Sequence, residues 1–112
     1  MRLFVYGSLM EPELRRRLLG RQVSAEPGYL HGFERRHGRY FYLARKAGGV
    51  VAGQILSALS AQELETLDRY EEVPRLYTRR RVSVLRSDRR PCRAWVYLPA
   101  PRLLLKAPAA PR

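Results

Sequence analysis

The sequence LFVYGSLM, residues 3–10, combines a short hydrophobic strand with a sharp turn. Residues 3–6 are bulky and mostly β-forming. Gly7 permits a positive φ and Ser8 can hydrogen-bond locally, so we expect the chain to bend here with exposed N–H groups. Exposed amides at a bend suit an anionic ligand. A purely structural turn is the alternative, because many α/β proteins begin with a short strand and a glycine turn.

Length and composition indicate one small globular domain. A chain of 112 residues and 13.0 kDa can bury a single hydrophobic core but has no room for a separate cofactor domain. The N-terminus enters a predicted strand at once and lacks the form of a signal peptide. No apolar run approaches the ~20 residues that a membrane-spanning helix needs. We therefore expect a cytoplasmic protein without a membrane partner.

Few residues in this chain are suited to metal or thiol chemistry. Cys92 is the only cysteine, and with only His31 and His37 besides it no spacing resembles a zinc site. We therefore expect no metal and no other cofactor. Cys92 alternates with the residues of a predicted strand, which favours a packed cysteine over a nucleophile.

The chain carries a formal net charge of +12 at pH 7, which would attract polyanions. Its arginines are dispersed in short groups, however, without an RNA-binding aromatic signature or a helix-turn-helix pattern. A solvated, arginine-rich surface is the simplest interpretation. Nucleic-acid binding remains an alternative. The arginine groups are residues 15–17, 35–36, 79–81 and 89–90.

Turn and capping signals divide the chain into short elements. Pro12 and Gly20 suit the start and the end of a first helix, and the capping box SAQE at 60–63 begins a second helix that ends near Glu72. A polar connection at 86–91 predicts a hairpin. Gly48 and Gly49 predict a turn. Strands are expected over residues 27–33, 40–44, 50–56, 77–85 and 93–98.

The predicted fold class is α+β. Because strands outnumber helices and their connections are short, we expect a small mixed or antiparallel, strongly curved β-sheet or barrel with two short flanking helices. A single domain is expected over residues 1–98. Residues 99–112 form a Pro/Ala-rich C-terminal tail, and its apolar cluster at 103–105 is the only anchor. We expect that tail to be mobile or loosely docked.

The second predicted helix carries a glutamate on its apolar stripe. At about 100° per residue, Glu71 falls within roughly 10° of the centre of the face that Leu64 and Leu67 define. Glu72 lies about 110° away, and Asp68 lies about 70° away at the border. Glu71 should therefore point inward. A buried carboxylate needs partners or a raised pKa, because burying it unpaired is costly.

Two interpretations of the inward glutamate stay open on the residues alone. Glu71 forms an ion pair, for which Arg79 is a good candidate, or it acts as a general base and acid at the bottom of a pocket. In the following strand, Tyr77 and Arg79 share one face while Val82 and Val84 share the other. If the valines face the core, Tyr77 and Arg79 reach it too only through a bulge or bend. A simply solvated Arg79 is the alternative.

Several motifs occur together in a fixed order: FVYGSLM at 4–10, LDRYE at 67–71, PRLYTRRRVSV at 74–84 and AWVY at 94–97. In this combination, and with Gly32 and Gly53 in their strand contexts, the chain resembles the γ-glutamylcyclotransferase-like family over residues 2–98. The resemblance implies a small mixed β-barrel with flanking helices. It also implies cofactor-free conversion of a γ-glutamyl amide into 5-oxoproline, with release of an amine or amino acid.

The family pattern implies roles for particular residues. It makes Glu71 the acid/base residue, and the loop that binds the small-molecule γ-glutamyl substrate consists of Tyr6, Gly7, Ser8 and Leu9. Glu72 departs from the pattern, because a small residue, often glycine, commonly follows the catalytic glutamate. Apart from the family pattern, Tyr77, Arg79 and Tyr97 are further candidates that position groups or set the pKa of Glu71; packing in the core is the alternative for each.

Three functions follow from these observations. The first is a γ-glutamyl cyclotransferase, whose substrate supplies its own α-amine as nucleophile, so that the protein needs only to fold the chain back and move protons. The second is a binding module of the same fold for a small carboxylate ligand. The third is a basic adaptor for nucleic acid or an acidic protein partner.

Overall fold

The computed structural model describes residues 1–106, and the side chains of residues 1–104. Its strands close into a barrel in the order β1-β3-β2-β4-β5. β1 runs parallel to β5, and the other neighbouring strands run antiparallel. This mixed barrel with helices confirms the predicted α+β class. The strands are β1 (Leu3–Val5), β2 (Ala25–His37), β3 (Phe41–Leu56), β4 (Tyr77–Arg86) and β5 (Pro91–Pro99).

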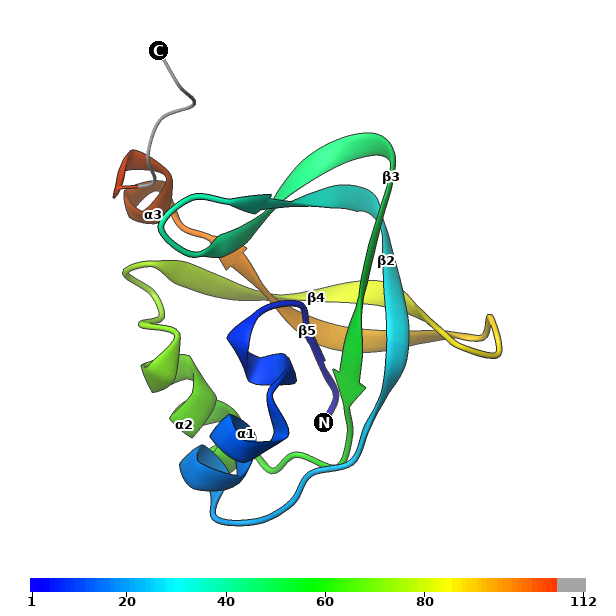
Figure 1. Ribbon diagram of the computed structural model, residues 1–112, viewed down its shortest axis with the longest axis vertical. Helices are drawn as coiled ribbons and strands as arrows, with labels where there is room; N and C mark the ends of the chain where they lie inside the picture. Colours follow the sequence, from blue (N-terminus) through cyan, green and yellow to red (C-terminus); the bar gives the residue numbers. More distant parts are fainter. Residues whose placement is uncertain (107–112) are drawn as a thin grey trace.

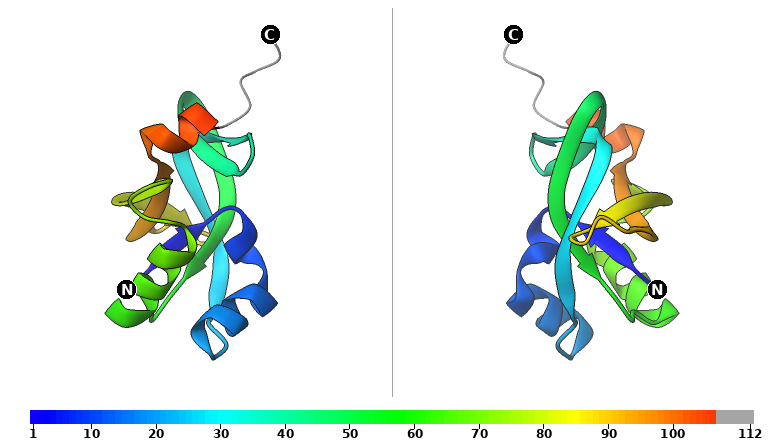
Figure 2. Two further views of the ribbon diagram at one scale, coloured as in Figure 1. Left: turned by 90° about the vertical axis from the view of Figure 1, so that its left-hand side faces the viewer. Right: turned by 90° about the vertical axis from the view of Figure 1, so that its right-hand side faces the viewer.

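The helices lie outside the barrel. α1 (Pro12–Leu19) and α2 (Ala61–Tyr70) lie at one end, and α3 (Pro101–Lys106) lies toward the other (Figure 1). The long strands β2 and β3 curve along the height of the molecule, from the level of α1 to that of α3 (Figure 2). No helix in residues 1–106 is long and apolar enough to cross a membrane.

The capping signals of the sequence place both expected helices. The Ser60 side chain accepts a hydrogen bond from the Glu63 amide at 3.0 Å, and the Glu63 side chain accepts one from the Ser60 amide at 3.0 Å. α1 ends at Gly20, whose φ of 74° lies in the left-handed region that favours glycine. The predicted starts of both helices and the predicted end of α1 are confirmed.

Apolar side chains form two cores, one inside the barrel and one beneath the helices. Successive residues of β1 alternate between them: Phe4 lies in the inner core, whereas Leu3 and Val5 lie in the outer core. A strand with a core on each face must be apolar throughout, which explains the continuous run at the N-terminus. The inner core also holds Tyr6, Leu30, Leu43, Ile55, Val84 and Val96; the outer core also holds Leu9, Leu64, Leu67, Tyr77, Tyr97 and Leu103.

The two cores also correct the expectation for β4. Its register with β5 runs unbroken from Tyr77 opposite Pro99 to Leu85 opposite Pro91, so the bulge that a core-facing Tyr77 was expected to require is absent from this strand. Tyr77 reaches the outer core while Val84 reaches the inner one. No bend is needed, because both faces of the strand have apolar neighbours. Cys92 on β5 packs against the inner core, as expected for a structural cysteine.

Two expected strands are one. The predicted segments 40–44 and 50–56 belong to β3, which pairs with β2 on both sides of a register shift. Phe33 lies opposite Arg45 and His31 lies opposite Val50, so residues 46–49 bulge out of the ladder. The glycine turn expected at 48–49 is this bulge, with Gly48 at a φ of 76°.

The segment after residue 98 also differs from expectation. Residues 101–106 form α3, and Leu103 is only 1% exposed in the outer core. The Ala100 amide donates to the Leu76 carbonyl at 2.8 Å, which ties this segment to the residues before β4. Leu103 is therefore a firm anchor for α3. The remainder of the predicted tail, 107–112, lies outside the described residues.

Gly53 allows β1 and β3 to approach each other. A Cβ at this position would lie 2.3 Å from the Val5 carbonyl oxygen and 2.8 Å from the Phe4 ring. We predict that Gly53→Ala lowers the free energy of unfolding by about 2–3 kcal/mol, because an overpacked core must shift its backbone. Urea unfolding measures this loss. Ser83→Ala, at an exposed strand position, is the control, and an equal effect of the two substitutions would contradict the close approach.

Candidate active site

A cavity of about 440 Å³ opens where the turn after β1, the tip of the β2–β3 hairpin and the end of α2 meet. It brings together segments that are far apart in the sequence. All four residues of the Tyr6-Gly7-Ser8-Leu9 tetrad line it, together with Glu71, Tyr77 and Tyr97. The structure therefore places the predicted acid/base residue and the predicted binding loop in one pocket. The other lining residues include His37, Arg39, Tyr40, Phe41, Tyr70, Glu72 and Leu76.

Glu71 is the residue at which α2 ends. Its amide still donates to the Leu67 carbonyl at 2.9 Å, so its side chain keeps the helical direction that the sequence predicted. Burial raises the pKa of Glu71 to about 7. A carboxyl group with such a pKa can take up and release a proton near neutral pH, as a general base and acid must.

The residue after Glu71 has a left-handed backbone. Glu72 has a φ of 56°; its amide donates to the Arg69 carbonyl at 3.1 Å, and the Val73 amide donates to the Asp68 carbonyl at 2.9 Å. This pair of hydrogen bonds is a Schellman motif, in which the left-handed position is usually glycine. The structure thus gives a physical reason for the small residue that the resemblance led us to expect here. The Glu72 carboxylate pairs with Arg75.

The tetrad bends through a 3₁₀ helix, η1 (Ser8–Met10). The bend is as predicted, but Gly7 has a φ of −134° and does not use the positive range. The first amides of such a turn have no partner within it, so they are free to face a ligand. The Ser8 and Tyr70 hydroxyls lie 3.0 Å apart and link the turn directly to the end of α2.

Arg15 supports the turn from behind. It is only 5% exposed, and its Nη1 donates to the carbonyls of Leu9 and Met10, each at 2.9 Å. Within residues 1–106 its buried Nε has no hydrogen-bond partner and the side chain forms no ion pair. Arg15 does not line the cavity, and its two contacts fix the direction of the last peptide groups of η1.

Three buried tyrosines build the floor of the pocket. The Tyr6 hydroxyl donates to the Tyr97 carbonyl at 2.6 Å, and the Tyr77 hydroxyl donates to the Phe41 carbonyl at 2.7 Å. Burial, and to a lesser extent the nearby carboxylate of Glu71, raises the pKa of Tyr6 and Tyr77. These hydroxyls stay protonated and tie the barrel strands and the hairpin together around Glu71.

Arg79 pairs with Asp68 and not with Glu71. Its Nε and Nη2 contact the two carboxylate oxygens of Asp68 at 2.9 and 3.1 Å, and the Tyr97 hydroxyl donates to the same carboxylate at 2.8 Å. The interpretation of Glu71 as the ion-pair partner of Arg79 is therefore wrong, and so is the alternative of a simply solvated Arg79. Asp68 takes this role because it sits at the border of the apolar stripe and faces β4. Arg79 itself does not line the cavity.

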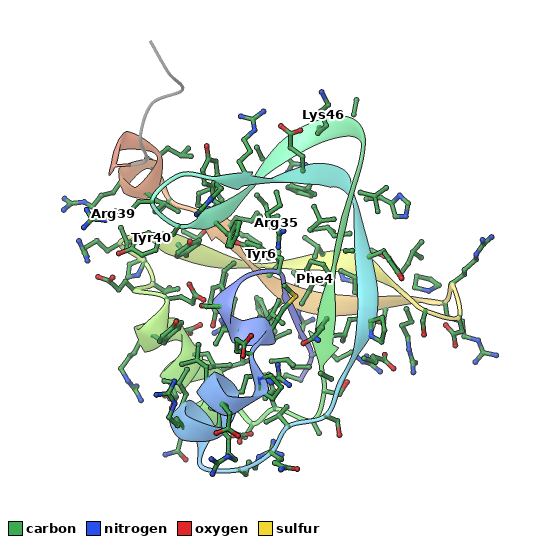
Figure 3. All side chains as sticks on the ribbon, viewed as in Figure 1. Phe4, Tyr6, Arg35, Arg39, Tyr40 and Lys46 are labelled. Carbon is green, nitrogen blue, oxygen red and sulfur yellow. The ribbon has the colours of Figure 1, made fainter. Side chains whose placement is uncertain are left out.

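Sequence reasoning missed the wall that the β2–β3 hairpin supplies. Arg39 and Tyr40 project from its tip, while Phe4 and Tyr6 lie in the middle of the barrel (Figure 3). Arg35 donates to the Tyr6 carbonyl at 2.8 Å and lies 4.5 Å over the Phe41 ring, so it joins the hairpin to the end of β1. Only the long-range pairing of the barrel brings these side chains to the pocket.

The family comparison agrees with the geometry. The family model described as gamma-glutamyl cyclotransferase, AIG2-like matches residues 3–111. The chain belongs to this family. The match extends past residue 98, where we expected the domain to end, and includes α3.

Curated relatives of this family member come from plants and archaea. AIG2-like protein C of Arabidopsis thaliana is 38% identical over 89 residues, which cover 77% of this chain and 51% of that protein. A Methanocaldococcus jannaschii protein, whose name includes gamma-glutamylcyclotransferase, is 29% identical over 98 residues, which cover 85% of this chain and 44% of that protein. The chain thus spans about half the length of the curated relatives it matches.

Solved structures share the fold. The solution structure of an Arabidopsis thaliana protein superposes with a TM-score of 0.80 at 30% identity, over 90% of this chain and 69% of that one. A structure titled gamma-glutamyl cyclotransferase gives a TM-score of 0.77 at 18% identity, over 89% of this chain and 66% of that one. At the latter identity the likeness concerns the fold alone.

Within the described residues of this family member, no three His, Cys, Asp or Glu side chains gather where they could hold a metal ion. The cavity is instead lined by tyrosines, two carboxylates and the hairpin cation Arg39. Such a lining suits a small polar molecule that is bound by hydrogen bonds and charge.

The left-handed backbone at position 72 favours glycine over any residue with a Cβ. We predict that Glu72→Gly is more stable than Glu72→Ala by about 1 kcal/mol, because a Cβ is strained in the left-handed region whereas glycine is not. Both variants lose the exposed pair with Arg75, so that loss cancels. Urea unfolding compares them, and an alanine variant as stable as the glycine variant would contradict the strain.

Proposed function

We propose that the chain is a γ-glutamyl cyclotransferase that converts a small γ-glutamyl amine or amino acid into 5-oxoproline and the free amine. One observation carries the proposal: the half-buried carboxyl group of Glu71, whose pKa is raised to about 7, shares a cavity with the residues of a tight turn. The family match and the relative that bears the cyclotransferase name support it. The cavity of about 440 Å³ suits a molecule of this size.

The proposed reaction is an internal aminolysis. The ionised Glu71 takes a proton from the substrate's α-ammonium group, and the free amine attacks the γ-carbonyl carbon to form the new C–N bond. The tetrahedral intermediate then collapses, and the original amide C–N bond breaks. Glu71 returns the proton to the departing nitrogen. The ring nitrogen loses a second proton, which the released amine takes up as its ammonium form, so atoms and charge balance without a cofactor. Because the nucleophile belongs to the substrate, the enzyme supplies positioning and proton transfer.

The turn at Gly7–Leu9 supplies backbone N–H donors for the negatively charged groups of the substrate. Its amides would hold the α-carboxylate or the oxyanion that develops on the γ-carbonyl. The Gly7 amide shares its peptide group with the Tyr6 carbonyl, which accepts from Arg35 at 2.8 Å. The Gly7 and Ser8 carbonyls accept from the Met10 and Glu11 amides, each at 3.0 Å, so the amides of this turn need little rearrangement when the substrate binds. The Ser8 hydroxyl, 3.0 Å from that of Tyr70, sets the spacing between the turn and the Glu71 end of α2.

Removing the proton carrier is the direct test. We predict that Glu71→Gln preserves the fold and lowers 5-oxoproline formation from γ-glutamyl amides by on the order of 10²–10⁴-fold. Chromatographic detection of 5-oxoproline measures turnover, and circular dichroism checks folding. Glu65→Gln is the control, because it removes the same charge from an exposed position on the same helix. Undiminished turnover in Glu71→Gln would contradict the assignment, and binding without turnover in the unmodified protein would favour a non-catalytic module.

The raised pKa of Glu71 predicts a pH dependence. A general base works in its ionised form, so kcat/KM should rise about tenfold per pH unit below pH 7 and level off above it. A rate that stays constant from about pH 5.5 to about pH 8 would contradict a base with this pKa.

The pH dependence of the free energy of unfolding tests the raised pKa of Glu71 independently of activity. Because the folded-state pKa of Glu71 lies above its unfolded value, the folded protein binds more protons between these two values. The free energy of unfolding should therefore fall as the pH rises through this range to about 7. In Glu71→Gln this fall should be smaller. Urea unfolding at several pH values measures the difference, and parallel curves for the two proteins would contradict the shift.

A further inference from the structure

A second cavity, of about 390 Å³, lies away from the candidate active site. It forms beside the start of β1, where the loop at 57–58 approaches β4 and β5. Its lining includes Arg2, Arg81, Arg93 and Trp95 and, in this described part of the chain, no carboxylate. None of these residues takes part in the proposed cyclisation.

Strand pairing builds this arginine cluster. The backbone amide of Trp95 donates to the Arg2 carbonyl at 2.9 Å, so the backbones of these two residues lie side by side. Arg81 on β4 lies directly opposite Trp95 on β5, and Arg93 stands two positions before Trp95 on the same face of the sheet. Three arginines from different segments therefore line one cavity beside Trp95.

The charges of the cluster are uncompensated. Seven other arginines form ion pairs with carboxylates, but within residues 1–106 Arg2, Arg81 and Arg93 form none. All three are exposed. Like charges that line one cavity repel each other, so an anion bound among them would relieve this repulsion.

Stacking holds part of the cluster in place. The Arg81 guanidinium lies 5.0 Å from the centre of the Trp95 ring, and that of Arg79 lies 4.3 Å from it. Arg79 is itself fixed by its paired contacts to Asp68. A stacked guanidinium keeps its N–H groups free at the edge of the plane, where they match the oxygens of a phosphate group.

We propose that the cavity beside Trp95 binds the phosphate group of a phosphate ester. Arg81 and Arg93 contact the phosphate oxygens, and Arg2 closes the site from the side of β1. Phosphate suits the cluster better than a single carboxylate does, because its several oxygens can accept from three separate guanidinium groups at once. A volume of about 390 Å³ also admits the organic part of the ester against Trp95. The same chemistry occurs in a free nucleotide and in the backbone of single-stranded RNA.

The chain offers a built-in reporter, because Trp95 is its only tryptophan. We expect uridine 5′-triphosphate or oligouridylate to change Trp95 fluorescence saturably. Saturation by the nucleotide alone identifies a free phosphate ester as the ligand, and saturation by oligouridylate identifies the RNA backbone. For oligouridylate, three arginine contacts predict a slope of about −2 for log affinity against log salt concentration. If neither probe changes the Trp95 fluorescence, the proposal is overturned.

Matched substitutions distinguish a site from diffuse charge. Arg81→Gln/Arg93→Gln should weaken binding at least tenfold, whereas Arg17→Gln/Arg102→Gln removes the same charge from α1 and α3 and should weaken it less than threefold. Equal weakening in both double variants overturns the proposal. Should Arg81→Gln/Arg93→Gln lose its fold by circular dichroism, Arg93→Gln alone replaces it, because Arg81 then remains stacked on Trp95. The single variant must still bind at least threefold more weakly than Arg17→Gln.

Discussion

The burial of β1 on both faces is the constraint on which the rest of the structure depends. This short strand pairs with β3 on one side and β5 on the other, and it places Phe4 in the inner core and Leu3 and Val5 in the outer core. The barrel closes through it, and the helices pack over it. The turn that follows is held at the mouth of the barrel, because it begins directly where the fixed strand β1 ends.

The position of Glu71 depends on a separate set of contacts. Asp68, one turn earlier on α2, is fixed by Arg79 and by the Tyr97 hydroxyl, so the last turn of the helix is clamped to β4 and β5. The Schellman motif then ends the helix at the glutamate. The ion pair neutralises Asp68, and within the described residues Glu71 forms no ion pair. Burial can therefore raise the pKa of Glu71, which a neighbouring arginine would have lowered.

The parts of the fold and the candidate site that depend on local sequence were predictable. The capping box placed α2, helical periodicity turned Glu71 inward, and the glycine turn placed the tetrad. Contacts between distant segments were not. Nothing near Arg39 or Asp68 in the sequence indicates the pocket wall or the partner of Arg79, and strand parity alone could not reveal that β4 has a core on each face. These contacts form only when the strands pair into the closed barrel.

The parallel pairing of β1 with β5 joins Leu3 to Trp95, nearly the two ends of the domain. During synthesis, the first strand must therefore wait until the last one has left the ribosome before the barrel can close. Until then the apolar run at residues 3–6 has no partner on one edge. The candidate active site also cannot exist earlier, because its floor includes Tyr97. Premature release of the nascent chain would yield an exposed, aggregation-prone strand and an incomplete pocket.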